Sequence, residues 1–228
     1  MPAALSEAAG RYPNFWYAEP LLGLSVAERL ALFEKTGFEI EEDAIAREYL
    51  ERIGEAYSGH PLALRVIVGE IGTRPFFGRV AAYWKRYGSE IEAVEEAIAQ
   101  AEQGHVSGKD DWKIDRLSKE VQRNVRQRLE QTFQRLAQEA KMAYLLLCSA
   151  SVYRCGVPED WWLGHLIFWT EDEKVQRLAM EALRDRCLVE ESLEDDEWHV
   201  KQHNLIRSVA MSHLEAMDKG SASAQTDT

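Results

Sequence analysis

Residues 104–110 are the part of this chain that is most like a phosphate-binding loop. In the motif G-x-x-x-x-G-K-[S/T], backbone amides and the lysine hold the phosphates while the hydroxyl binds Mg²⁺. Here three residues separate Gly104 from Gly108, and Asp110 stands where the hydroxyl belongs. We therefore interpret the stretch as an ordinary loop. No aliphatic run that ends in acidic residues supplies a Walker B strand either.

Metal-binding and nucleophilic chemistry also lack a recognisable pattern. The three cysteines, Cys148, Cys155 and Cys187, are an odd number at wide spacing, which favours reduced thiols over disulfides or a zinc site. None of the six histidines stands at ligand spacing from a cysteine. No serine, cysteine or pair of acids lies in a known catalytic motif. The sequence therefore predicts that the chain has no metal site and is not an enzyme.

Pro61, His203 and Asn204 stand where predicted helices begin. A proline at a helix start either touches a bound ligand or only fits the first turn, where its missing N–H costs nothing. His203 lies between a predicted strand and a predicted helix, so its imidazole either reaches a phosphate or caps the helix. The residues alone leave both alternatives open.

The first half of the chain predicts an irregular lead-in over residues 1–24 and an all-helical unit over residues 25–115. Ser25-Val-Ala-Glu28 has the form of a capping box, and the segment after Pro61 is apolar almost all round, which predicts a buried helix. Residues 104–111 are the expected loop. The spacing of apolar residues predicts helices over 25–37, 42–57, 61–68, 76–87 and 91–101.

The second half predicts a winged helix-turn-helix over residues 116–217 and a disordered tail over 218–228. A long amphipathic helix has an apolar face that runs from Val121 to Leu136. Its expected outer face carries Arg116, Lys119, Arg123, Arg126 and Arg128. After it, the sequence predicts a helix over 140–150, a short helix that starts at Pro158, and a helix over 171–185 that follows a capping box at 170–173. A β-hairpin over 188–201 with an acidic turn at 194–197 and a helix over 205–217 follow. The predicted fold class is thus mainly α, a helical bundle followed by a winged helix with a small hairpin.

Two stretches of the chain resemble NB-ARC proteins, which belong to the STAND class of P-loop NTPase switches. In the helical unit, residues 24–33 followed by Gly59-His-Pro-Leu-Ala-Leu-Arg65 resemble the GLPL-containing first ARC domain. In the second unit, Leu183-Arg-Asp-Arg-Cys-Leu-Val189, the hairpin and Gln202-His-Asn-Leu-Ile-Arg207 resemble the winged-helix second ARC domain and its MHD motif. The resemblance covers about residues 21–217, in the order of the family.

The resemblance implies a nucleotide near both motifs. By position it places Pro61 against the base and His203 at the phosphates of bound ADP, with Asn204 at the position of the MHD aspartate. This chain departs from the family at His60, which replaces a leucine, and at Asn204, whose amide lacks the charge of an aspartate. The absent P-loop implies that ADP or ATP would be bound mainly by a P-loop domain supplied in cis or in trans, and that the chain holds no cofactor by itself.

Composition restricts the partners and the compartment. A formal net charge of −12 makes nucleic acid an unlikely partner, since polyphosphates are repelled. The expected recognition helix adds no attraction, and the acidic turn of the hairpin adds repulsion. No apolar run reaches the roughly 20 residues that span a bilayer, and the N-terminus has no signal-like pattern, so we expect a cytoplasmic protein without membrane contact.

Three functions are compatible with these observations. The first is a regulatory part of an NB-ARC or STAND-type signalling switch that helps to close over nucleotide. The second is a nucleotide-free module that binds other proteins through exposed aromatic residues such as Trp16, Trp161 and Trp162. The third is a winged-helix DNA-binding regulator, which the acidic hairpin disfavours.

Overall fold

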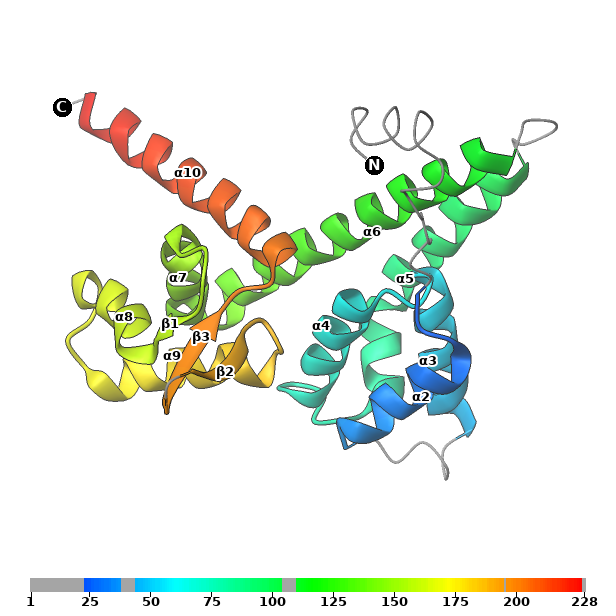
Figure 1. Ribbon diagram of the computed structural model, residues 1–228, viewed down its shortest axis with the longest axis horizontal. Helices are drawn as coiled ribbons and strands as arrows, with labels where there is room; N and C mark the ends of the chain where they lie inside the picture. The colour runs from blue at the N-terminus through cyan, green and yellow to red at the C-terminus, as the bar shows by residue number, and fades with distance from the viewer. Residues whose placement is uncertain (1–22, 38–43, 104–109, 195, 227–228) are drawn as a thin grey trace, which may run out of the picture.

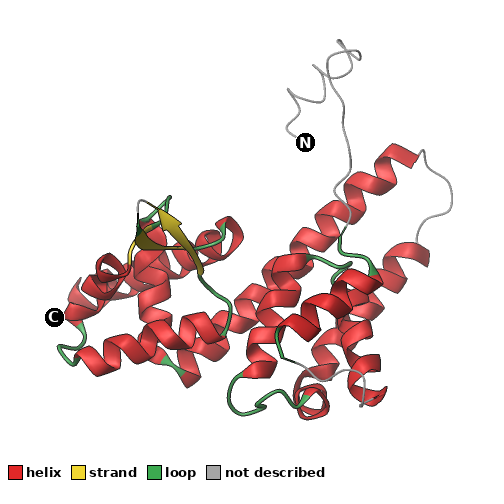
Figure 2. Ribbon diagram, turned by 60° about the horizontal axis from the view of Figure 1, so that its bottom comes forward, coloured by secondary structure: helices red, strands yellow, loops and turns green. Residues whose placement is uncertain are grey.

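The computed structural model of this chain describes residues 23–37, 44–103, 110–194 and 196–226, with only the backbone for 101–103, 110–120 and 220–226. The described chain is mainly helical and contains one small antiparallel sheet of three strands (Figures 1 and 2). This confirms the mainly α fold class. The expected lead-in over residues 1–22 and the loop over 104–109 lie outside the described residues.

The helical unit begins as its caps and apolar spacing predict. Ser25 Oγ accepts from the backbone N–H of Glu28, and the Glu28 carboxylate accepts from the backbone N–H of Ser25, which confirms the capping box. The helix that starts at Pro61 is buried on nearly every side, as its apolar composition predicts. The helices of this unit are α2 (Val26–Lys35), α3 (Ala44–Ala56), α4 (Pro61–Gly72) and α5 (Val80–Gln103).

The expected pair of helices over 76–87 and 91–101 is wrong, because α5 is one continuous helix from Val80. Gly88 does not break it, since the ring of Trp84 packs where a Cβ would stand. Buried Tyr83 and Ile91 lie on either side of this glycine, so one helix face continues into the core. Phe76 precedes the helix, in the turn after α4.

The long helix α6 (Asp110–Glu139) joins the two halves of the chain (Figure 1). It packs against α4 and also against α7 and α10 of the second half. Its apolar face is buried from Val125 to Leu136, as predicted. The helix starts at Asp110, so the expected unit boundary at residues 115 and 116 falls inside it.

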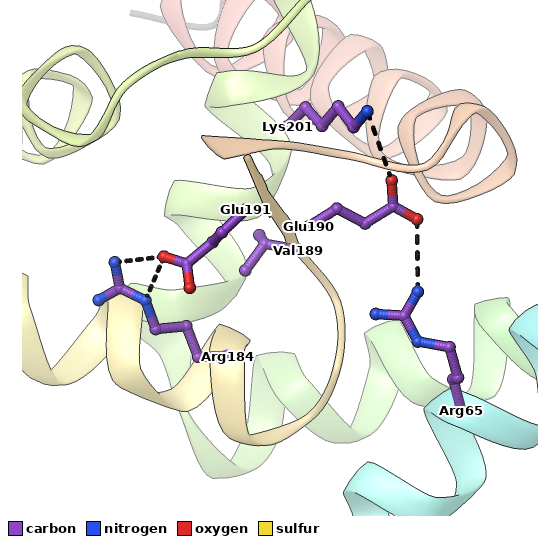
Figure 3. A pocket seen from close by; sticks show the side chains of 6 residues that line it. All are labelled: Arg65, Arg184, Val189, Glu190, Glu191 and Lys201. Atoms are coloured by element: carbon purple, nitrogen blue, oxygen red, sulfur yellow. Dashed lines mark hydrogen bonds and ion pairs between the residues drawn. The ribbon is translucent and has the colours of Figure 1, made fainter. Parts of the chain in front are cut away.

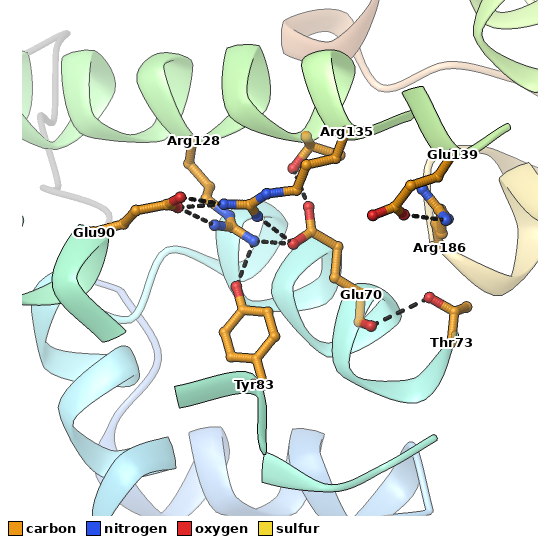
Figure 4. Close-up of polar contacts among 9 residues, drawn as sticks. Glu70, Thr73, Tyr83, Glu90, Arg128, Arg135, Glu139 and Arg186 are labelled. Atoms are coloured by element: carbon orange, nitrogen blue, oxygen red, sulfur yellow. Dashed lines mark hydrogen bonds and ion pairs between the residues drawn. The ribbon is translucent and has the colours of Figure 1, made fainter. Parts of the chain in front are cut away.

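Arg128 is not on the outer face of α6, where the sequence analysis put it. Its guanidinium is buried and pairs with Glu70 of α4 and Glu90 of α5 (Figure 4). Arg135, two turns along on the same face of α6, pairs with the same two carboxylates. Arg123 and Arg126 are exposed as expected, and the side chains of Arg116 and Lys119 lie outside the described part of the structure.

The buried carboxylate of Glu70 stays charged in this network. Burial by itself raises the pKa of Glu70, but the charges of Arg128 and Arg135 and a 2.6 Å hydrogen bond from Thr132 outweigh it and lower the pKa. Tyr83 completes the group with its hydroxyl 2.5 Å from Arg128 Nη2. These contacts fix α4 and α5 against α6.

The described part of the second half contains four α-helices, two short 3-10 helices and a sheet whose hairpin the sequence predicts. The strands lie in the order β1-β3-β2, and Val200 of β3 pairs with both Val157 and Glu191. The buried Trp162 donates to the carbonyl of Val200 at 3.2 Å, which fixes α8 on the sheet. The elements are α7 (Lys141–Ser149), η1 (Ala150–Val152), β1 (Val157–Pro158), α8 (Glu159–Gly164), η2 (His165–Phe168), α9 (Glu173–Asp185), β2 (Glu190–Glu194), β3 (Glu197–Lys201) and α10 (Asn204–Thr226).

Three details of this half differ from the expectation. Asp172 caps α9 by accepting from the N–H of Lys174 at 2.9 Å, so the expected capping box at 170–173 is wrong. The hairpin strands extend to Glu194 and from Glu197, which shortens the turn. α10 continues past Met217 to Thr226, where the sequence predicts a disordered tail. Among the described helices, none is both long and apolar enough to cross a membrane.

Candidate functional site

The turn before α4 is held in place by backbone contacts that require glycine. Gly59 has φ +67, and a Cβ there would stand 2.3 Å from the carbonyl oxygen of Leu24. The N–H of Leu24 donates to the carbonyl of Gly59 at 2.8 Å, and Arg29 Nε donates to the carbonyl of Leu24 at 2.7 Å. The turn therefore presents His60 and Pro61 from a fixed backbone.

His60 is the N-cap residue of α4, and Pro61 is its exposed first residue. The His60 side chain makes no capping hydrogen bond to α4, and its Nδ1 is buried without a partner among the described residues. A helix start without a side-chain cap leaves first-turn N–H groups free, and the helix dipole adds partial positive charge there. The first turn of α4 thus has no capping acceptor from the His60 side chain.

His203 directly precedes α10, as His60 directly precedes α4, but only His203 caps its helix. Its Nδ1 accepts from the backbone N–H of Leu205 at 3.2 Å, so the imidazole caps the helix. The N–H of Arg207 closes the first turn on the carbonyl of His203 at 2.9 Å. With Nδ1 used as an acceptor, the Nε2 atom carries the proton of the neutral ring and remains the donor of this side chain. Asn204, beside it, is exposed.

His60 and His203 are far apart in the sequence, but the charge of one acts on the other in the folded structure. Half-burial is the main cause that lowers the pKa of His60, and the charge of His203 lowers it further. The two imidazoles are therefore within electrostatic range of each other. Pro61 and Asn204 each lie next to one of these histidines in the chain.

A hollow of about 450 Å³ lies between α4, α9 and the hairpin (Figure 3). Some of its lining residues are close in sequence to Pro61 and His203. Arg65, one turn along α4 from Pro61, has its Nη1 3.4 Å from Glu190 Oε1. Lys201, two residues before His203, has its Nζ 3.9 Å from Glu190 Oε2. The Glu190 carboxylate therefore lies between two cations from the two halves of the chain.

The opposite wall of the hollow carries a third cation. The Arg184 guanidinium pairs with Glu191, with its Nε 2.8 Å from the carboxylate, and also pairs with Glu159. Sequence analysis missed Arg65, Arg184 and Lys201, because nothing in their spacing shows that three elements meet here. The position of Arg65, on the same helix face as Pro61, was the available signal.

A second polar group joins α6, α7 and α10. Tyr144 Oη lies 3.0 Å from His213 Nδ1, and His213 Nε2 lies 2.8 Å from Glu130 Oε2. The nearby Cys148 is unsuited to act as a nucleophile in this group, because burial raises its pKa to about 12. The group holds α10 onto α6 and α7.

The described residues contain no cluster of three or more His, Cys, Asp or Glu that could hold a metal ion. No known protein family matches the chain, and no curated protein sequence matches it significantly.

Proposed function

We propose that this chain is a regulatory part of an NB-ARC or STAND-type signalling switch. It closes over ADP or ATP that is bound mainly by a P-loop domain, supplied in cis or in trans, and it acts in the cytosol. The observation that carries the proposal is that the two motif-like segments meet, since Arg65 of the first pairs with Glu190 of the second at 3.4 Å and the charge of His203 acts on His60. These two segments are separated by most of the chain in sequence, yet they are in contact in the folded structure.

The arrangement of the second half supports this proposal. The chain order is α7, α8, α9 and then the β2–β3 hairpin, with β1 as a third strand. This order and pairing are those expected of a winged helix. The α4 segment with its leading proline then belongs to the helical domain that precedes it.

The hydrogen-bond donors at the starts of α4 and α10 suit a nucleotide phosphate. The start of α4 has uncapped N–H groups, and His203 retains its Nε2–H as a donor. Arg65 and Lys201 lie nearby in the chain, but Glu190 neutralises them in this structure. The chain thus supplies phosphate-facing groups at the edge of the site, while the P-loop domain supplies the main binding energy.

Protein binding without nucleotide is the second candidate function. It is favoured by the apolar surface around α8 and η2, where Trp161, Phe168 and Trp169 are exposed. Trp162, which the sequence analysis also counted as exposed, is fully buried. DNA binding has no such support, since α9 and the hairpin carry more acidic than basic side chains.

A titration that follows the histidine side chains by NMR tests the nucleotide role. The imidazole signals of His60 and His203 are expected to shift as Mg-ADP is added up to about 10 mM, a range that covers millimolar dissociation constants. The signal of His213, whose Nε2 lies 2.8 Å from Glu130, serves as the internal control. If neither turn responds, the nucleotide role is lost and the protein-binding function is favoured.

His203→Asn is the matched variant for this titration. Asparagine still caps a helix, so the fold is retained while the Nε2–H donor is removed. We expect the variant to keep the stability of the wild type and to lose the ADP-induced shift at His60. Asn204→Asp restores the charge of the MHD motif, and we expect it to change the nucleotide response while the stability stays the same.

A further inference from the structure

An arginine-rich turn stands out on a chain with a formal net charge of −12. Between Gly72 and Gly88 the sequence has four cationic residues and no acidic one. Three of the four gather around the turn from α4 to α5, and we name Arg74, Phe77, Arg79 and Arg86 the arginine turn. All four side chains are exposed, and Phe77 is 63% exposed.

The arginine turn has a fixed shape. Phe77 has φ +49, and its N–H donates to the carbonyl of Thr73 at 2.9 Å. Arg79 Nε donates to the carbonyl of Phe76 at 3.0 Å, and the Arg74 guanidinium lies 5.9 Å from the centre of the Phe77 ring. A large apolar residue held at positive φ in solvent is costly for the isolated chain, so the turn presents Phe77 without any benefit to the core.

None of the three arginines has a carboxylate within ion-pair distance among the described residues. Arg86 lies 5.9 Å from the centre of the Phe76 ring, which places it beside the turn and leaves its charge unneutralised. Three cations without an ion-pair partner among the described residues, one of them beside the exposed Phe77 ring, form a surface suited to an anionic partner that also carries an apolar group.

The same chain carries such a surface at the end of its hairpin. We name Leu193, Glu194, Asp196, Glu197 and Trp198 the acidic hairpin tip. Leu193 and Trp198 lie opposite each other across the strands and are 57% and 62% exposed. Glu194 and Glu197 are also directly opposite, although like charges in that position destabilise a hairpin. Neither carboxylate has an ion-pair partner within the described chain.

We propose that the arginine turn binds the acidic hairpin tip of a second copy of this chain. The contact pairs Phe77 with Leu193 and Trp198, and it pairs the three arginines with Glu194, Asp196 and Glu197. The contact relieves the repulsion among the arginines of the turn and among the carboxylates of the tip. Within one molecule neither surface can relieve this repulsion. Because the two surfaces differ, the contact is head-to-tail and each copy keeps one free surface for another copy.

Sedimentation velocity on the full chain tests this contact. We expect association to increase from about 1 μM to about 500 μM protein, and to weaken sharply when salt is raised from about 50 mM to about 500 mM. The variants Arg74→Glu with Arg79→Glu, and Glu194→Lys with Glu197→Lys, are each expected to weaken association by about tenfold or more. Circular dichroism and thermal melting show whether the variants keep their fold.

Mixing the two variants gives the decisive result. The native tip of the first variant meets the native turn of the second, and the two reversed surfaces also match, so association returns in the mixture. The control Arg123→Glu with Lys141→Glu makes the same change of net charge as the arginine-turn variant, at exposed residues elsewhere, and leaves association unchanged. The proposal is overturned if the wild type stays monomeric at low salt, if the variants associate as it does, or if the mixture does not recover. Binding of anionic vesicles or DNA to the arginine turn of a monomeric wild type would identify a different occupant.

Discussion

Gly69 of α4 lies against the backbone of Arg186, the residue at the end of α9. A Cβ on Gly69 would stand 2.5 Å from the carbonyl carbon of Arg186. The Arg186 side chain then pairs with Glu139 at the end of α6, 2.9 Å away. The helical half and the sheet-bearing half are therefore in direct backbone contact, which only glycine permits.

Gly69→Ala is expected to destabilise the protein, because the added methyl must push α4 away from α9. We expect a loss of about 1–3 kcal/mol in the free energy of unfolding, as for other overpacked sites. Urea denaturation measures it. Gly72→Ala on the same helix is the control, since nothing lies within 4 Å of its Cβ position. Equal effects of the two substitutions would contradict the close contact.

Glu70→Ala is expected to be among the most damaging single substitutions in the helical half. It leaves Arg128 buried with only Glu90 and Tyr83 as partners, and breaking a buried ion pair costs about 3–5 kcal/mol. Glu95→Ala removes a partly exposed pair with Arg52 and should cost less than about 1 kcal/mol. A comparison of the two urea midpoints checks the difference.

Glu70 also makes the protein sensitive to acid. Its pKa is lower in the folded state than the ordinary value of 4.5, so the folded state holds this proton less tightly than the unfolded state. The resulting stability is present above that ordinary value and is lost as the pH falls through the folded pKa. Denaturation from neutral pH to about pH 3 measures this loss, and the loss should be smaller in Glu70→Gln.

His60 gives a pH dependence in a higher range. Its pKa is lowered from 6.5 by burial and then by His203, so the unfolded state binds this proton more readily. Stability is therefore expected to fall as the pH drops through 6.5 and to level off below the folded pKa. Thermal midpoints across this range measure the slope. His60→Gln should flatten it, and an unchanged slope would show that His60 does not titrate as its surroundings require.

The capping role of His203 predicts a difference between two substitutions. His203→Ala removes the acceptor for the N–H of Leu205 and should cost about 0.5–2 kcal/mol, the usual range for a lost N-cap. His203→Asn retains a capping acceptor and should cost much less. Chemical denaturation of both variants provides the test, and similar losses in the two would argue against capping.

Local patterns in the sequence were enough to predict most helices and the hairpin. The capping box at Ser25, the all-round apolar segment after Pro61 and the buried face from Val125 to Leu136 depend on neighbours within a few residues, so spacing reveals them. The errors occurred where a tertiary contact overrides local propensity. Between the expected helices over 76–87 and 91–101 the chain stays helical, because Tyr83 and Ile91 of one continuous helix are both buried in the core.

Arg128 shows why charge patterns mislead. In the sequence it continues a row of basic residues, which usually marks a solvent-exposed face. Its burial depends on Glu70, which is 58 residues away and belongs to a segment otherwise read as apolar. No spacing rule connects two such residues, because the energy that keeps both buried exists only once α4 and α6 are packed together.

The sequence by itself determined the mainly α class, the position of the hairpin and the helix start at Pro61, and it placed the start of the last helix one residue late, at Leu205. Those features follow from caps, turns and apolar periodicity, which act over one or two turns of chain. Only the tertiary structure put His60 within electrostatic range of His203 and placed Glu190 between Arg65 and Lys201. Such contacts depend on how α4, α6 and α9 pack, and packing is set by the shape and burial of side chains that are far apart in the sequence.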